Sequence, residues 1–203
     1  MVENQSDSAP ACAGRRVIIT GAADGTGALC ARVLAECGAD LLLVDFDKVM
    51  VNRLAAELGA EAFSLDVLSE LGVGRFMTEI KLRNTPVDLL INAAGSGHVR
   101  TLGMLRVTAA FAGIVGDQKA TVINVASTDT RSDPFRDSRA QLPFGRASAD
   151  SVSLSEKPEL VVMTIEAPKA REQVVELLRN WCGCSGERRV NLSCGPPEQA
   201  GTP

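Results

Sequence analysis

The chain has 203 residues, a net charge of −4 and a hydrophobic content of 45%, which is the size and balance of a single globular domain with its own core. It has no excess of basic residues, so nucleic acid is excluded as an expected partner. Its apolar runs, such as 41–44 and 160–163, are too short to cross a bilayer. Residues 1–14 lack the basic and apolar regions of a signal peptide. We therefore expect a cytoplasmic protein that does not enter a membrane.

Short apolar runs alternate with helical segments along the first two thirds of the chain. Residues 1–14 form an expected flexible tail, and a single domain is expected over 15–203. Parallel strands need long crossovers, and helical crossovers cover both faces of a sheet. The pattern predicts a doubly wound α/β domain with a parallel sheet of about six strands. The first strands are expected at 16–20, 41–44, 61–64, 87–91 and 121–126, and the helices between them include 48–58, 68–82 and 101–114.

The pattern changes after residue 127. Residues from about 128 to 158 are rich in Ser, Asp, Arg and Pro, which predicts a long polar loop or insertion. A strand over 160–165, a helix over 169–181 and a short strand over 190–192 follow. The six cysteines show no spacing typical of a disulfide framework or a common zinc site, so we interpret them as reduced thiols.

A glycine-rich turn connects the first strand to the first helix. It reads Thr-Gly-Ala-Ala-Asp-Gly-Thr-Gly over 20–27, and such a turn lets the backbone and a helix N-terminus approach a pyrophosphate. Asp24 within it is either a cofactor contact or a helix N-cap. Asp45 closes the second strand, where a carboxylate can accept hydrogen bonds from both ribose hydroxyls. Because this carboxylate would repel a 2′-phosphate, the turn predicts NAD in preference to NADP.

Four stretches together resemble the classical short-chain dehydrogenase/reductase family. They are the turn over 20–27, Asp66-Val67, the Asn-Ala-Ala-Gly segment over 92–95, and the strand over 122–127 that ends in a serine. The resemblance implies a Rossmann-like fold that binds a nicotinamide nucleotide. The cofactor-binding residues expected are Gly21, Asp24, Gly25, Thr26, Gly27, Asp45, Phe46, Asp66, Val67, Asn92, Ala93, Ala94 and Gly95.

The family's catalytic tyrosine has no counterpart, because the chain contains no tyrosine. The family's Tyr-x-x-x-Lys motif opens a long helix, and two registers are possible, with Phe144 or Ile165 at the tyrosine position. The second register is preferred because it retains Lys169. Ser127 and Lys169 are thus the expected catalytic remnants. The resemblance also implies a C-terminally shortened relative that lacks the family's last strand and substrate lid.

These features lead to two functional hypotheses. The first is an NAD(H)-binding protein with impaired catalysis that acts as a sensor or binds a protein partner or a second copy of itself. The alternative is an active NAD-dependent oxidoreductase, or a non-redox enzyme on the same scaffold, that uses an acid/base other than tyrosine.

Overall fold

A computed structural model describes residues 12–94, 97–115, 119–126, 152–153, 160–166 and 170–183. Its seven strands form one sheet in the order β3-β2-β1-β4-β5-β7-β6. Every neighbouring pair is parallel except β6 and β7. The doubly wound α/β class is thereby confirmed. The strands are β1 (Arg16–Thr20), β2 (Asp40–Asp45), β3 (Glu61–Ser64), β4 (Leu89–Asn92), β5 (Ala120–Ala126), β6 (Val152–Ser153) and β7 (Leu160–Glu166).

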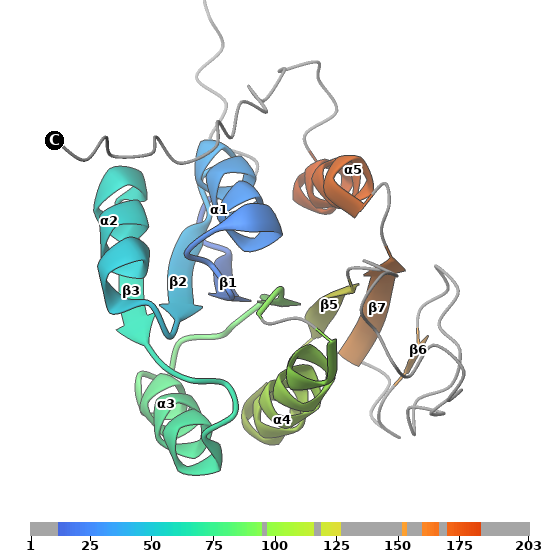
Figure 1. Cartoon of the computed structure of the whole chain (residues 1–203). Coiled ribbons are helices and arrows are strands. Elements are labelled where there is room, and N and C mark those ends of the chain that lie inside the picture. The colour runs from blue at the N-terminus through green and yellow to red at the C-terminus, as the bar shows by residue number, and fades with distance from the viewer. Residues whose placement is uncertain are drawn as a thin grey trace, which may run out of the picture.

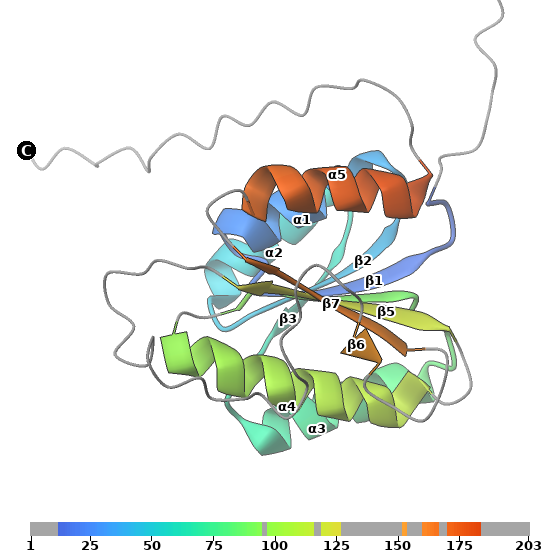
Figure 2. The same cartoon turned by 90° about the vertical axis from the view of Figure 1, so that its right-hand side faces the viewer.

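Helices cover both faces of this sheet (Figure 1). The helices α1 (Gly25–Glu36), α2 (Lys48–Leu58) and α5 (Ala170–Cys182) lie on one face, and α3 (Glu70–Leu82) and α4 (Gly97–Val115) lie on the other, as Figure 2 shows edge-on. Consecutive strand residues point to opposite faces. In β1, Val17 and Ile19 therefore join the core under α1 and α5, while Ile18 joins the core under α3 and α4. Buried apolar residues on both sides are what a central parallel sheet requires.

Two predicted segments differ from the structure. The prediction of a flexible tail over 1–14 is wrong for residues 12–14, which form a turn with a fully buried Cys12. The amide of Cys12 donates a hydrogen bond to the carbonyl of Cys37 at 2.9 Å, so the turn is fixed to the end of α1. The loop predicted over 128–158 contains the short strand β6, which pairs antiparallel with β7 and brings the count to seven strands. The strand predicted over 190–192 lies outside the described residues.

The prediction that all cysteines are reduced is wrong for one pair. Cys12 and Cys182 form a disulfide, with Cα atoms 5.4 Å apart. The partners are separated by 170 residues in sequence, and they meet only because α5 returns across the face that carries α1. Cys30 and Cys37 are buried thiols.

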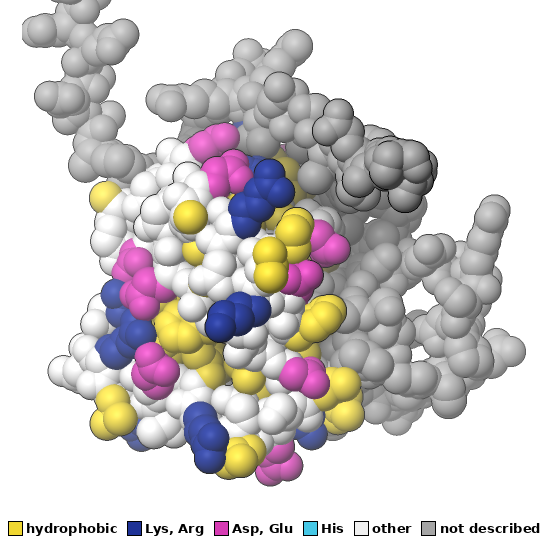
Figure 3. Space-filling view, turned by 60° about the vertical axis from the view of Figure 1, so that its left-hand side comes forward, with side chains coloured by type: hydrophobic (Ala, Val, Ile, Leu, Met, Phe, Trp, Pro, Cys, Tyr) yellow, Lys and Arg dark blue, Asp and Glu magenta, His cyan; other side chains and the backbone are white. Residues whose placement is uncertain are grey.

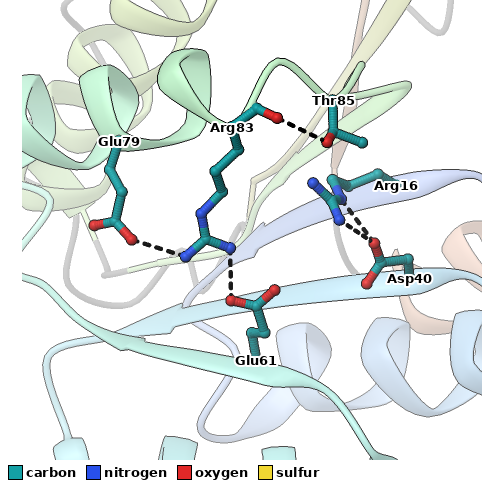
Figure 4. A network of polar contacts seen from close by, with 6 residues as sticks. All are labelled: Arg16, Asp40, Glu61, Glu79, Arg83 and Thr85. Atoms are coloured by element: carbon teal, nitrogen blue, oxygen red, sulfur yellow. Dashed lines mark hydrogen bonds and ion pairs between the residues drawn. The ribbon is translucent and has the colours of Figure 1, made fainter.

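Ion pairs gather at the amino edge of the sheet, where the parallel strands begin (Figure 4). Arg16 at the start of β1 pairs with Asp40 at the start of β2, with nitrogen and oxygen 2.7 Å apart. Arg83, just after α3, bridges Glu61 at the start of β3 and Glu79 within α3 at 2.6 and 2.7 Å. Hydrogen bonds to these two carboxylates raise the pKa of the Arg83 guanidinium. Within the described part of the chain, no helix has the length and apolarity needed to cross a membrane.

Candidate functional site

The predicted cofactor residues meet at the carboxyl edge of the sheet. Gly21 follows β1, Asp45 ends β2 and Asn92 ends β4, and these three strands are parallel neighbours. From β1 the chain winds outward to β2 through α1, whereas β4 lies on the other side of β1. Strand order reverses at this point, and open α/β sheets bind ligands in the crevice beyond it.

The glycine-rich turn packs closely against the loop that follows β4. Gly21 has a φ of +69°, and a Cβ there would lie 2.5 Å from the Cα of Ala94. A Cβ on Gly27 would lie 1.9 Å from the carbonyl oxygen of Gly21. The amide of Ala93 also donates to the carbonyl of Thr20 at 3.0 Å. Side chains at either glycine would therefore separate two backbones that are in direct contact.

The N-terminus of α1 differs from those of the next two helices. Asp47 caps α2 by accepting from the amides of Val49 and Met50, and Ser69 caps α3. Asp24 occupies the N-cap position of α1, but its exposed side chain makes no capping hydrogen bond. Gly25 follows with a φ of +53°, and no described atom beyond its chain neighbours lies within 4 Å of where its Cβ would be. The first-turn amides of α1 are thus left without a side-chain cap, as an anion site requires.

The carboxylate of Asp45 is held in place by two backbone amides. Its Oδ2 accepts from the amide of Ala23 and its Oδ1 from the amide of Asp47, each at 3.0 Å. The residue is 8% exposed. A carboxylate oxygen can accept more than one hydrogen bond, so Asp45 can shape the glycine-rich turn and still bind a ribose hydroxyl. Phe46, the next residue, is 79% exposed at the same edge.

Asn92 has its side chain directed into the protein. It is 1% exposed, and its Oδ1 accepts from the hydroxyl of Thr20 at 3.2 Å. Its Nδ2 donates to the hydroxyl of Thr108 in α4 at 3.0 Å and to Oδ1 of Asn124 in β5 at 2.9 Å. Asn92 therefore connects β4 to β1, β5 and α4 near the carboxyl edge. Sequence reasoning missed Thr108 and Asn124, although a polar residue within an otherwise apolar helix or strand is a signal for such a role.

Asp66 and Val67 lie just beyond the end of β3 at the same edge. Asp66 is exposed, and its Oδ1 accepts from the amide of Leu68 at 2.9 Å. The amide of Leu65 donates to the carbonyl of Asp45 at 2.8 Å, which joins this segment to the end of β2. Val67 is buried against α4, since a Cβ on Gly103 would lie 2.6 Å from its Cγ2.

The predicted catalytic residues are described only in part. β5 ends at Ala126, and Ser127, Gly95, Phe144 and Lys169 lie outside the described residues. Ile165 lies inside β7, where it pairs with Val125 of β5. The strand predicted over 160–165 is thereby confirmed, and the helix predicted over 169–181 corresponds to α5, which begins at Ala170. The β-branched residues of this segment favour a strand beside β5.

A shallow depression of about 690 Å³ follows the outer surface of α3. Its lining includes Leu71, Arg75 and Leu82 and none of the predicted site residues. Hydrophobic side chains on the face shown in Figure 3 alternate with charged ones. The depression is therefore separate from the predicted cofactor residues at the carboxyl edge.

Comparison with known proteins gives a consistent picture. The family model described as short chain dehydrogenase matches residues 15–136, more than half of the chain. The chain is 34% identical over 87 residues to the 2,3-dihydro-2,3-dihydroxybenzoate dehydrogenase of Bacillus subtilis (strain 168), which covers 40% of this chain and 33% of that protein. It is 27% identical over 142 residues to the 3-hydroxyacyl-CoA dehydrogenase type-2 of Drosophila melanogaster, covering 54% and 56%.

A solved structure shares the fold. The 3-ketoacyl-(acyl-carrier-protein) reductase from Brucella melitensis, complexed with NADH, superposes with a TM-score of 0.52 at 28% identity, covering 57% of each chain. The matched segments span about a third of the Bacillus subtilis relative and little more than half of the other two proteins.

Proposed function

The chain belongs to the short-chain dehydrogenase family, and from this premise we propose that it binds NAD(H) at the carboxyl edge of its sheet, has impaired catalysis, and acts as a sensor or partner-binding protein. The observation that carries the proposal is the carboxylate of Asp45, fixed by two backbone amides beside the glycine-rich turn. The cytoplasmic location and a protein partner or second copy belong to the same proposal.

The local structure supports nucleotide binding. The uncapped first turn of α1 would hold the pyrophosphate, and Gly25 leaves room for it. Asp45 would accept hydrogen bonds from the adenosine ribose, and Phe46 and Asp66 lie at the same edge for the adenine. When bound, a nicotinamide nucleotide supplies a hydride donor or acceptor.

The charges near the ribose favour NAD over NADP. Asp24 follows β1, Asp45 ends β2 and Asp47 follows β2 at this edge, and the turn over 21–27 contains no basic residue. A 2′-phosphate would bring negative charge against these carboxylates, which is unfavourable without a compensating cation.

Impaired catalysis is supported by the lack of the family's usual acid. The chain has no tyrosine, and Ile165, one candidate for its position, lies in a strand. Loss of a positioned general acid lowers a rate roughly a hundredfold to ten-thousandfold. The alternative, an active NAD-dependent oxidoreductase or a non-redox enzyme with another acid/base, is favoured by Ser127, which comes directly after β5 in the sequence.

Titration calorimetry with NADH and NADPH tests the binding site. We expect the wild type to prefer NADH, and Asp45→Ala to weaken NADH binding about tenfold to a hundredfold, because a hydrogen bond to a charged group contributes about 1.5–3 kcal/mol. Asp40→Ala is the matched control, since Asp40 begins the strand that Asp45 ends. Absence of binding to the wild type, or equal losses in the two variants, would contradict the proposal.

A panel of ketones and secondary alcohols, followed by NADH absorbance, separates the two functional hypotheses. Impaired catalysis predicts no hydride transfer above background with any of them. Turnover that disappears in Ser127→Ala would establish the alternative instead.

A further inference from the structure

Contacts between four residues fasten the end of α5 to the turn before β1, and we call these residues the terminal clasp: Cys12, Arg15, Trp181 and Cys182. Cys12 and Cys182 are joined by the disulfide. The guanidinium of Arg15 lies over the ring of Trp181, with Cζ 4.6 Å from its centroid, and Nη1 donates to the carbonyl of Trp181 at 3.0 Å. The clasp therefore combines a covalent bond, a cation–π contact and a hydrogen bond.

The clasp holds a helix that depends on its packing. α5 has 13 residues, and a helix of that length is marginal in isolation. It lies along α1 on one face of the sheet (Figure 2), where Val174 and Leu178 are fully buried in the same core cluster as Leu34 of α1. Residues that keep α5 against α1 thus decide whether this part of the core stays closed.

The surroundings of Cys12 and Cys182 are compatible with both the disulfide and the reduced thiols. Cys12 and Cys182 are buried at 0% and 3% exposure, and a cysteine thiol packs as a small hydrophobic group. The reduced pair can therefore stay in the core without an unsatisfied strong polar group. Cys12 lies in a turn and Cys182 is the last residue of α5, and the ends of elements open locally at lower free energy than their centres.

We propose that Cys12 and Cys182 form a reversible thiol–disulfide site whose oxidation fastens α5 to α1. With glutathione disulfide as oxidant, a cysteine thiolate attacks one glutathione sulfur and releases glutathione, giving a mixed disulfide. The second cysteine then attacks the protein sulfur of that bond and releases the other glutathione. One disulfide breaks, one forms, and the two cysteine protons end on two glutathione thiols.

Cys30 is a buried thiol that does not compete in this exchange. It is fully buried in α1, and this burial raises its pKa to about 12. The thiolate is the reacting species, and the middle of a helix opens less readily than its end, so Cys30 stays unreactive near neutral pH. A bond that exchanges with glutathione also fits the predicted cytoplasmic setting, where permanent disulfides are rare.

The test compares the full chain after equilibration with glutathione disulfide and with dithiothreitol. Peptide mapping without reduction should give a cross-linked peptide pair containing Cys12 and Cys182 only in the oxidised sample. Trp181 is the sole tryptophan and neighbours the disulfide, which quenches indole emission, so reduction should raise its fluorescence. Reduction should also lower the thermal midpoint by about 5–15 °C and speed hydrogen exchange in α5 but not in α3.

Three variants identify the residues responsible. Cys12→Ser and Cys182→Ser should remove both the fluorescence change and the redox-dependent shift of the midpoint. Cys184→Ser, two residues further along, should keep both. Loss of these responses in Cys184→Ser, identical properties of the oxidised and reduced wild type, or a bond that resists excess dithiothreitol in the folded protein would each overturn the proposal. If a serine variant fails to fold, the peptide map of the wild type tests the proposal by itself, because the cross-linked pair must be present after oxidation and absent after reduction.

Discussion

The two edges of the sheet carry polar residues in opposite ways. At the carboxyl edge, Asp45 and Asn92 are buried and hydrogen-bonded to amides or to other side chains. At the amino edge, Arg16 and Arg83 form ion pairs with carboxylates that remain substantially exposed. Burial makes a polar group costly to leave without partners, whereas exposed pairs exchange readily with water. Side-chain positions are therefore fixed at the carboxyl edge, whereas substitutions at the amino edge should cost less stability.

The largest effect that this comparison predicts is for Gly27→Ala at the carboxyl edge. The added Cβ would lie 1.9 Å from the carbonyl oxygen of Gly21, so the turn must shift, and we expect loss of NADH binding with destabilisation of about 3 kcal/mol or more. Gly74→Ala in α3 is the control, because its Cβ would meet no described atom within 4 Å. It should stabilise the protein by up to about 1 kcal/mol. Urea denaturation measures the stability of both variants, and calorimetry measures their NADH binding. A Gly27→Ala variant with wild-type stability and binding would contradict the predicted difference between the two edges.

The next effect is for Asn92→Leu. This change leaves Thr20, Thr108 and Asn124 without their shared partner in the interior, so we expect a loss of about 2–4 kcal/mol in the free energy of unfolding. Asn52→Ala is the control, because the amide of exposed Asn52 donates only to a carbonyl one turn earlier in its own helix. Denaturation midpoints should separate the two variants clearly. Equal midpoints would mean that the buried network contributes no more than a surface bond.

The smallest effect is expected at the amino edge, for Arg83→Met. The variant loses two ion pairs and the contact of the guanidinium with the ring of Phe63, where Cζ lies 5.4 Å from the centroid. We expect a loss of about 1 kcal/mol or less. The difference from wild type should shrink in high salt, which screens exposed charges. A loss as large as that of Asn92→Leu, unchanged by salt, would show that the amino edge is as specific as the other.

Local patterns in the sequence predicted the helices and strands, but they did not predict the contacts between segments that are distant in sequence. The helix over 48–58 has its predicted bounds, because its apolar spacing and Gly59, which adopts a left-handed conformation, are both local signals. The glycine-rich turn and Asp45 were also found in sequence. Three contacts were not predicted, because they depend on how strands and helices pack in space. They are the hydrogen bond from the amide of Ala23 to Asp45, the side-chain partners of Asn92, and the disulfide between Cys12 and Cys182.

Ile165 is a position where the family motif and the local sequence pattern predict different structures. The preferred register placed it at the family's tyrosine position because Lys169 follows four residues later, whereas the local pattern predicted a strand over 160–165. Its own neighbours form an apolar run with several β-branched residues, which favours a strand, and the structure has a strand there, paired residue by residue with β5. Residues four apart are neighbours on one face of a helix, whereas along a strand they lie about 13 Å apart.

The disulfide also closes the described chain into a ring. Cys12 and Cys182, near the two ends of the described chain, have Cα atoms 5.4 Å apart. The spatial order of the elements therefore does not depend on where the chain is opened. A short peptide could join these ends, and a new break at the exposed turn after α3, where Asn84 has a φ of +50°, would leave the strand order and register unchanged. We therefore expect a circularly permuted chain opened after α3 to keep the same fold.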